Sequence, residues 1–336
     1  MYHSRFKGTH YEAGLRYGDI LYKHGADLSH AFSKDSKKIE FVKESIKIYE
    51  REYPEVLDEI RGVAEGMRIP FEDLSTFLLG MYCFIFNNRC TNTAVFDGDN
   101  IIFGRNSDFL VSLEKQYEST YYKLDNSNSF IGNTTTMIQM EDGVNEHGLA
   151  VGLTFIYPLK IKPGLNAGMM VRYILEKCKN VAEALEKLQN FTIGSAQTIT
   201  MIDRAGDMAV VECNCETLYV IRPEPEQIFV HATNNLKSPE MLQYQYDGVD
   251  DIHSGERYET VYNALKDRKN CSVEYMKEIL TGKQGFMCQY DRAQVFDAVW
   301  SSIYDLKNMK IYRAEGNPSR VKYKEDTRLK FIKSGD

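Results

Sequence analysis

Residues 88–108 read NRCTNTAVFDGDNIIFGRNSD. Two runs rich in β-branched and apolar residues flank an Asp/Gly/Asn cluster, which is the pattern of a β-hairpin. Cys90 begins the first strand and Arg105 and Asp108 end the second, so antiparallel pairing is expected to bring all three side by side. A cation close to a thiol lowers the pKa of that thiol and makes it a nucleophile. The hairpin therefore predicts a reactive cysteine.

The composition of the chain is that of an ordinary globular protein. Its 336 residues are 43% hydrophobic and 26% charged, enough for one large domain or two smaller ones. The net charge is −7 with acids and bases interleaved, so we expect neither a nucleic-acid nor a membrane partner. We see no apolar signal region at the N-terminus and no run of the ~18 apolar residues that a membrane span needs. Seven cysteines in such a chain indicate a reduced, cytoplasmic protein.

The sequence pattern changes at Cys90. Residues 1–89 show helical spacing of apolar residues in four stretches, at 11–22, 40–52, from Pro54 onward and at 71–84. After Cys90, strand-like runs alternate with pairs of helices. Strands are expected at 138–155, 197–201, 208–222, 226–234, 294–304 and 310–315, and helices at 168–178, 181–188, 256–265 and 273–280. Strand clusters separated by helix pairs predict an α+β fold with two sheets and helices outside them.

The hairpin resembles the nucleophile hairpin of the N-terminal-nucleophile (Ntn) hydrolases, in the superfamily of acyl-CoA:6-aminopenicillanic acid acyltransferase, choloylglycine hydrolase and the acid ceramidases. In that branch an internal Cys-Thr becomes a new N-terminus when the precursor cuts itself, and a Gly-Arg-Asn-x-Asp motif follows about one hairpin later. Here these are Cys90-Thr91 and residues 104–108. Further landmarks come in the family's order at 145–153, 232–235 and 300–306. The resemblance implies a four-layered αββα sandwich, with two antiparallel sheets between helical layers.

The resemblance also implies how such an enzyme is activated. The Cys90 thiol attacks the Arg89 carbonyl, and the resulting thioester hydrolyses. The free α-amino group of Cys90, with an unperturbed pKa of about 7.7–8.0, then serves as the base, while the thiol forms an acyl-enzyme. We expect residues 1–89 to be a helical pro-segment (α-subunit) and residues 90–336 to be the Ntn-hydrolase catalytic region (β-subunit), together one compact unit.

The family pattern implies roles for other residues. Arg105 would hold the thiolate and orient substrate, and Asp108 would accept a hydrogen bond from the new α-ammonium. Asn234 is the expected oxyanion donor, a contribution of roughly 2.7–4 kcal/mol in known cases. Without that pattern, Arg105 and Asp108 form an ordinary strand-end ion pair and Asn234 is a turn residue. The candidates for binding substrate are Asn145, Glu146, Tyr157, Arg257 and Arg292, of which the first two suit a turn equally well.

Three functions stay open on sequence alone. The first is an autoprocessed cysteine amidase or acyltransferase acting on a small-molecule amide or acyl donor, since hydrolysis and transfer share the acyl-enzyme. The second is a Cys–His hydrolase without self-cleavage, in which Cys90 works with His231 or His147. The third is a non-catalytic Ntn-fold binding or assembly protein. No metal or organic cofactor is implied, the cleaved pro-segment is the expected protein partner, and homo-oligomerisation stays open.

Overall fold

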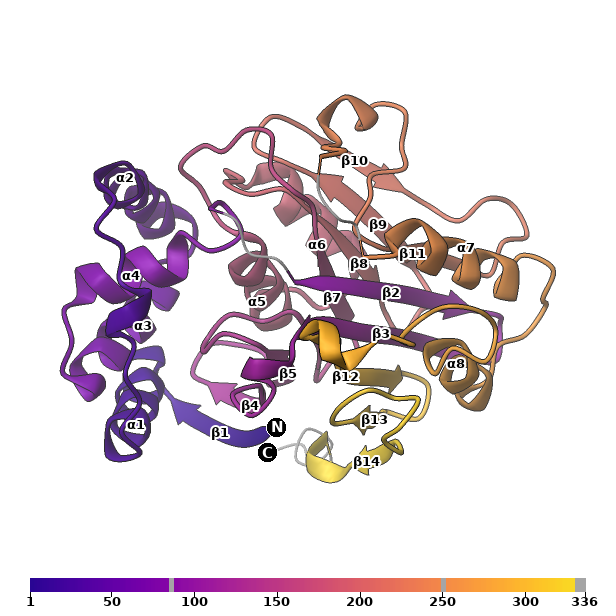
Figure 1. Ribbon diagram of the computed structural model, residues 1–336, viewed down its shortest axis with the longest axis horizontal. Helices are drawn as coiled ribbons and strands as arrows, with labels where there is room; N and C mark the ends of the chain where they lie inside the picture. The colour runs from indigo at the N-terminus through magenta and orange to yellow at the C-terminus, as the bar shows by residue number, and fades with distance from the viewer. Residues whose placement is uncertain (85–87, 249–251, 330–336) are drawn as a thin grey trace.

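The computed structural model describes residues 1–84, 88–248 and 252–329. Two sheets lie face to face and helices cover their outer faces, which makes a four-layered αββα sandwich (Figure 1). The predicted α+β class and the layered architecture are therefore confirmed. Within the described residues, no helix combines the length and the apolar character that crossing a membrane requires.

The first sheet has eight described strands. Their order is β1 (Tyr2–Gly8), β4 (Glu118–Leu124), β5 (Phe130–Thr134), β6 (Asp142–Asn145), β7 (Ala150–Phe155), β8 (Gln197–Ile202), β9 (Met208–Cys213) and β10 (Leu218–Ile221). The pairing of β1 with β4 is parallel, and the other pairs are antiparallel. The expectation of two purely antiparallel sheets is wrong at this edge, because a strand from the N-terminal segment joins a sheet built by residues after Cys90.

The second sheet has six described strands, all antiparallel. Their order is β11 (Phe229–Ala232), β2 (Arg89–Phe96), β3 (Ile101–Leu110), β12 (Phe296–Asp305), β13 (Lys310–Ala314) and β14 (Lys324–Asp326). The predicted hairpin is the β2–β3 pair, and nearly every residue in it is buried. The first sheet covers one of its faces, and α7 (Ser254–Leu265) and α8 (Val273–Leu280) cover the other.

Two groups of helices lie against the first sheet. Its outer face is covered by α5 (Ala167–Lys177) and α6 (Val181–Asn190). The lobe at the left of Figure 1, called the N-terminal lobe below, consists of α1 (His10–Lys23), α2 (Ser36–Glu52), α3 (Pro54–Met67) and α4 (Phe71–Leu79). Single-turn 3₁₀ helices lie at Ser29–Ala31, Val111–Leu113, Leu242–Tyr244, Arg292–Gln294 and Thr327–Leu329. The helices expected in residues 1–89 are thus present, but β1 was missed because only Phe6 in it is buried, which leaves no apolar alternation.

The first and third helices cross at unusually close range. Gly14 and Gly18 of α1 face Gly62 and Gly66 of α3, and a Cβ at any of the four would collide with backbone atoms of the other helix. Glycine alone lets two helical backbones come so near. The N-terminal lobe is therefore built on a tight helix pair that the sequence encodes by four glycines.

A buried charge network ties this lobe to the rest of the molecule. Arg172 of α5 donates to Glu59 of α3 and to Glu176 of α5, both at 2.6 Å, and Glu176 lies 2.9 Å from His10 of α1. Burial raises the pKa of Glu176, but Arg172 and His10 outweigh it and hold the value at about 2. The acids and His10 are potential metal ligands; Arg172 already supplies the positive charge that they need.

We expect Arg172→Met to cost about 3–5 kcal/mol of unfolding free energy, because two buried carboxylates lose their cation. Urea denaturation at neutral pH measures this loss. The matched control is Lys177→Met on the same helix, whose ion pair with Glu55 is partly exposed and should contribute at most about 1 kcal/mol. Equal losses in the two variants would contradict the importance of the buried network.

Candidate active site

The β2–β3 hairpin sets the register of the candidate site. Cys90 pairs with Ser107, Asn92 with Arg105, and Arg89 with Asp108. Cys90, Arg105 and Asp108 are each fully buried. The pairing therefore brings the three together, as the sequence pattern predicts.

The guanidinium of Arg105 is hydrogen-bonded directly to the sulfur of Cys90. Its Nη2 is 2.9 Å from Cys90 Sγ and 3.1 Å from Glu141 Oε2. Its Nη1 donates to Asn92 Oδ1 at 2.9 Å and to the Leu153 carbonyl. These contacts come from β2, β7 and Glu141, the residue before β6, so Arg105 is held from several sides.

The thiol itself is not activated in the intact chain. Burial raises the pKa of Cys90 to about 12, which outweighs the opposing effect of Arg105, and the charges of Glu141 and Asp108 raise it further. The expectation that the nearby cation lowers this pKa is therefore incomplete. The cation is present, but removal of water from the thiol is the larger effect, so the uncut chain holds a neutral thiol.

Asn234 and Arg257 hold the backbone of Cys90. The Cys90 amide nitrogen donates to Asn234 Oδ1 at 3.0 Å, and Arg257 Nη1 donates to the Cys90 carbonyl at 2.7 Å. Arg257 Nη2 also donates to Asn234 Oδ1, at 3.0 Å, while Asn234 Nδ2 donates to the Phe155 carbonyl at 2.9 Å. Two donors fix the amide oxygen toward Cys90. In the uncut chain Asn234 Oδ1 is thus an acceptor for Cys90, and the role of Asn234 as oxyanion donor stays a prediction.

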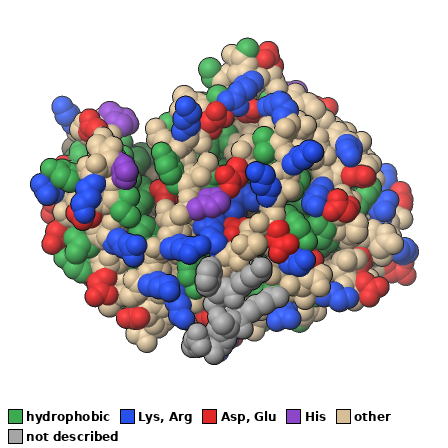
Figure 2. Space-filling model, turned by 90° about the horizontal axis from the view of Figure 1, so that it is seen from below, with side chains coloured by type: hydrophobic (Ala, Val, Ile, Leu, Met, Phe, Trp, Pro, Cys, Tyr) green, Lys and Arg blue, Asp and Glu red, His purple; other side chains and the backbone are tan. Residues whose placement is uncertain are grey.

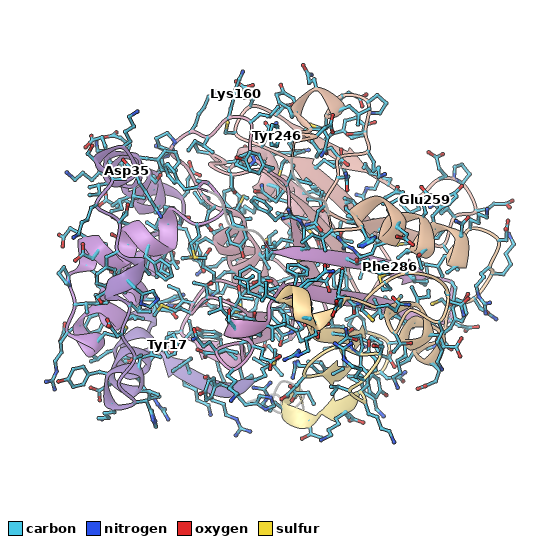
Figure 3. All side chains as sticks on the ribbon, in the orientation of Figure 1. Tyr17, Asp35, Lys160, Tyr246, Glu259 and Phe286 are labelled. Atoms are coloured by element: carbon cyan, nitrogen blue, oxygen red, sulfur yellow. The ribbon has the colours of Figure 1, made fainter. Side chains whose placement is uncertain are left out.

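The two oxygens of the Asp108 carboxylate differ in their hydrogen bonding. Its Oδ2 accepts from the Tyr290 hydroxyl at 3.0 Å and lies 3.7 Å from Arg257 Nη1, whereas its buried Oδ1 has no hydrogen-bond partner among the residues that the structure describes. Burial raises the pKa of Asp108 to about 6, against the lowering effects of Arg257 and Tyr290. Phe286, labelled in Figure 3, packs edge-on against Tyr290 with 5.5 Å between ring centroids and supports it. The carboxyl group is thus close to its protonation point near neutral pH.

The chain matches a known protein family over most of its length. The sequence profile of the acyl-coenzyme A:6-aminopenicillanic acid acyl-transferase family matches residues 95–320, about two thirds of the sequence. The chain belongs to this acyl-transferase family. It is therefore an Ntn-type enzyme, an amidohydrolase acting on C–N bonds other than peptide bonds or an N-acyltransferase. No curated protein sequence matches it significantly.

A solved structure shares the fold of this family member. A variant of conjugated bile acid hydrolase from Clostridium perfringens is similar with a TM-score of 0.50 and 13% identity, over 72% of this chain and 93% of that one. The N-acylethanolamine-hydrolyzing acid amidase ortholog of Caenorhabditis elegans gives 0.49 and 18% identity, over 65% and 93%. At such identities the first similarity shows the fold alone, which is that of the Ntn hydrolases.

The other candidates for substrate binding separate into two groups. Arg257 belongs to the buried site, whereas Arg292 is half exposed and pairs with Glu114 and Asp297. Asn145 accepts from the backbone of the β6–β7 turn and donates to two carbonyls at the end of α5. Glu146 accepts from the Ser129 amide in the same turn. Arg292, Asn145 and Glu146 thus make local ion-pair or turn contacts, and a substrate contact for them stays a prediction.

Tyr157 lies nearer to the site. It follows Phe155, whose carbonyl accepts from Asn234, by two residues. Its ring stacks on Tyr246, which is labelled in Figure 3, with 4.6 Å between centroids. A substrate contact for Tyr157 stays a prediction.

Neither candidate histidine contacts Cys90. His231 lies in β11 with its ring 4.0 Å from that of Tyr258, and burial lowers its pKa to about 3. His147 is partly exposed and pairs with Asn128. Among the described residues, the hydrogen bond to the Cys90 sulfur comes from Arg105 and not from an imidazole.

Several further residues, which the sequence pattern does not predict, belong to the site. Glu141 and Asp142 both face Arg105, with Asp142 Oδ1 3.5 Å from its Nε. The sequence did contain a signal for these two residues. They are adjacent acids inside the strand-like stretch 138–155, and acidic residues are rarely buried unless they have a partner. Tyr290 lies in a loop and nothing in the sequence singles it out.

A cavity of about 820 Å³ lies between the N-terminal lobe and the sheets. Its walls include Tyr17, Leu21, Phe77 and Met81 from the lobe, and Phe109, Thr135, Thr136 and Met137 from the other side. Figure 2 shows a notch in the outline between the lobe at the left and the main body, with hydrophobic side chains along it. The labelled Tyr17 in Figure 3 comes from the lobe, and its hydroxyl donates to the buried Glu118 of β4. The cavity is the size of a typical small-molecule site.

Proposed function

We propose that the chain is an autoproteolytically activated cysteine hydrolase or acyltransferase that cuts or transfers the acyl group of a linear non-peptide amide. One observation supports this most strongly: three atoms of Cys90 have buried polar partners. Its sulfur is hydrogen-bonded to Arg105, its amide nitrogen to Asn234 and its carbonyl oxygen to Arg257. A structural cysteine needs only packing, whereas a residue that becomes both nucleophile and amine needs such contacts.

In the proposed self-cleavage, the Cys90 sulfur attacks the carbonyl carbon of Arg89. The C–S bond forms, the Arg89–Cys90 C–N bond breaks, and the thiol proton passes to the departing nitrogen. Water then hydrolyses the thioester, which frees the Arg89 carboxylate and restores the thiol. Asp108 is the proposed proton carrier, since its Oδ1 is unpaired and its pKa of about 6 suits transfer near neutrality. The products have 89 residues and the remaining 247 of the 336.

After cleavage the same contacts acquire a second use. The former amide nitrogen of Cys90 becomes an amine, for which Asn234 Oδ1 and the free oxygen of Asp108 are the proposed acceptors. As a free base this amine takes the thiol proton, and the sulfur attacks the acyl carbonyl of the substrate. The leaving amine takes that proton, and water or another amine resolves the acyl-enzyme. The Asn234 amide nitrogen carries a second N–H, which is the proposed oxyanion donor.

The cavity of about 820 Å³ is the proposed space for the acyl group. Its lobe-side wall is largely apolar, which suits an acyl chain or ring. Residues 1–89 build that wall, so we propose that they stay bound as a subunit after cleavage. A cytoplasmic location is also proposed, on the grounds that all seven cysteines are unpaired thiols.

Trapping the acyl-enzyme tests this function. Activated acyl esters of several sizes, quenched in acid, are expected to add the acyl mass to Cys90, as peptide mass spectrometry would show. His231→Asn and His147→Ala should be acylated at rates near that of the wild type, because neither ring contacts Cys90. If either variant loses acylation but still cuts itself, the Cys–His alternative is favoured. A Cys90 that none of the esters acylates would overturn the proposal.

A further inference from the structure

Glu141 is a fully buried carboxylate whose two oxygens face different parts of the molecule. Its Oε2 accepts from Arg105 Nη2 and from the Ser107 hydroxyl, both at 3.1 Å. Its Oε1 accepts from the Thr135 amide at 3.2 Å and from the Thr135 hydroxyl. Both oxygens thus have two donors each, which leaves the carboxylate one orientation.

The two sides of Glu141 lead to two features already described. On one side, Arg105 Nη2 is shared between Glu141 and the Cys90 sulfur, and Ser107 is the residue paired with Cys90 across the hairpin. On the other side, Thr135 lines the 820 Å³ cavity and is only half buried. An unbroken run of contacts therefore joins the cavity wall to the sulfur.

We propose that Glu141 is a positioning residue of the reaction, which fixes the Arg105 guanidinium on the Cys90 sulfur and links it to the cavity wall at Thr135. This inference rests on the proposed function, because it assigns a role within that site. Glu141 does not touch the sulfur and acts through Arg105. A substrate group that binds Thr135 from the cavity would compete for the hydroxyl that now serves Glu141.

The direction in which each substitution changes thiolate formation at Cys90 follows from charge. The charged or titratable groups around the sulfur and the Arg105 guanidinium bonded to it are Arg257, Glu141, Asp142, Asp108 and Tyr82. Neutralising Glu141 leaves more of the Arg105 charge for the thiolate, so thiolate forms more readily. Removing the Thr135 hydroxyl does the reverse, because the Glu141 charge is then less well compensated. Opposite changes at the two ends of the contact run are thus expected.

Alkylation of Cys90 by iodoacetamide measures the thiolate, with the modified peptide quantified by mass spectrometry and with wild type and variants compared in the same cleavage state, which electrophoresis of each sample shows. At about pH 8 we expect Glu141→Gln to react about tenfold faster than wild type, a pKa change of about one unit, and Thr135→Val about threefold slower. The matched control is Glu212→Gln, another buried carboxylate, held by Lys237 and Ser238 away from the site, which should leave the rate unchanged.

The outcomes separate this inference from the proposed function. A merely structural Glu141 would loosen the site, so that both variants react faster or neither changes, and either result overturns the positioning role. Alkylation does not require self-cleavage or a substrate. If Cys90 is never acylated by the esters but the two variants still shift in opposite directions, the proposed function fails, and what stands is the effect of Glu141 on the Cys90 thiolate through Arg105.

Discussion

Cys90→Ala is expected to remain a single chain of 336 residues, whereas the wild-type protein separates into fragments of 89 and 247 residues under denaturing conditions. The substitution removes the only atom that the proposed mechanism uses to attack the Arg89 carbonyl. It removes at the same time the sulfur that would carry the acyl group. Both processing and turnover should fall by roughly 10⁴-fold or more, the scale on which enzymes lose rate without their nucleophile.

Electrophoresis and intact-mass measurement of freshly purified protein check this result, and N-terminal sequencing of the larger fragment should begin Cys-Thr. Cys178→Ala is the matched control. That cysteine is also buried, burial likewise raises its pKa to about 12, and it lies at the end of α5, away from the hairpin. It should be processed like the wild type. A Cys90→Ala protein cut at the same bond would refute self-cleavage by the thiol.

The parts of this site that the sequence predicted are those that lie close together in the chain. The hairpin is local, so the Asp/Gly/Asn turn and the strand lengths suffice to place Arg105 and Asp108 beside Cys90. The effect of Arg105 on the thiol was harder to predict. It depends on burial of the thiol against the first sheet, which no local pattern reports.

Long-range contacts account for most of what was missed. The orientation of the Asn234 amide is fixed by Arg257, which reaches it from α7, so the acceptor role could not be read from the Thr-Asn motif alone. Asn145 is the opposite case. Its turn chemistry was visible in the sequence, and the structure uses all of it locally.

Two of the strands missed by the sequence, β4 and β5, share one property that the mostly exposed β1 lacks. β4 and β5 are buried on both faces, so they lack the polar alternation that marks a half-exposed strand. The single strand predicted at 208–222 is two strands, because Asn214 accepts from two following backbone amides and closes a turn between them. Local turn chemistry overrode the continuous β pattern there.

Asp108→Asn is expected to stop self-cleavage and yet to stabilise the protein at neutral pH. The pKa of Asp108 is about 6 in the folded chain against an ordinary 3.8. The folded state therefore binds the proton more tightly than the unfolded state. The stabilising protonated form is fully present below pH 3.8 and is lost as the pH rises through 6. Above pH 6 the buried charge costs up to about 3 kcal/mol, and asparagine removes that cost.

Urea denaturation at pH 7.5 and at about pH 3.8 measures the difference, with Cys90→Ala as the background in both arms so that cleavage does not interfere. The variant should gain about 2–3 kcal/mol at the higher pH and little at the lower one. Asp326→Asn is the control of opposite sign, because Arg328 and Arg313 hold the pKa of Asp326 far below its usual range despite partial burial. It should lose stability at pH 7.5.

The result that would contradict this role has two parts. Asp108→Asn would be less stable at neutral pH, and with Cys90 intact it would still cut itself at the wild-type rate. Asp108 would then be an ordinary structural acid. A gain in stability together with a roughly 10³-fold loss of processing would instead mark a charge that the fold tolerates for the sake of proton transfer.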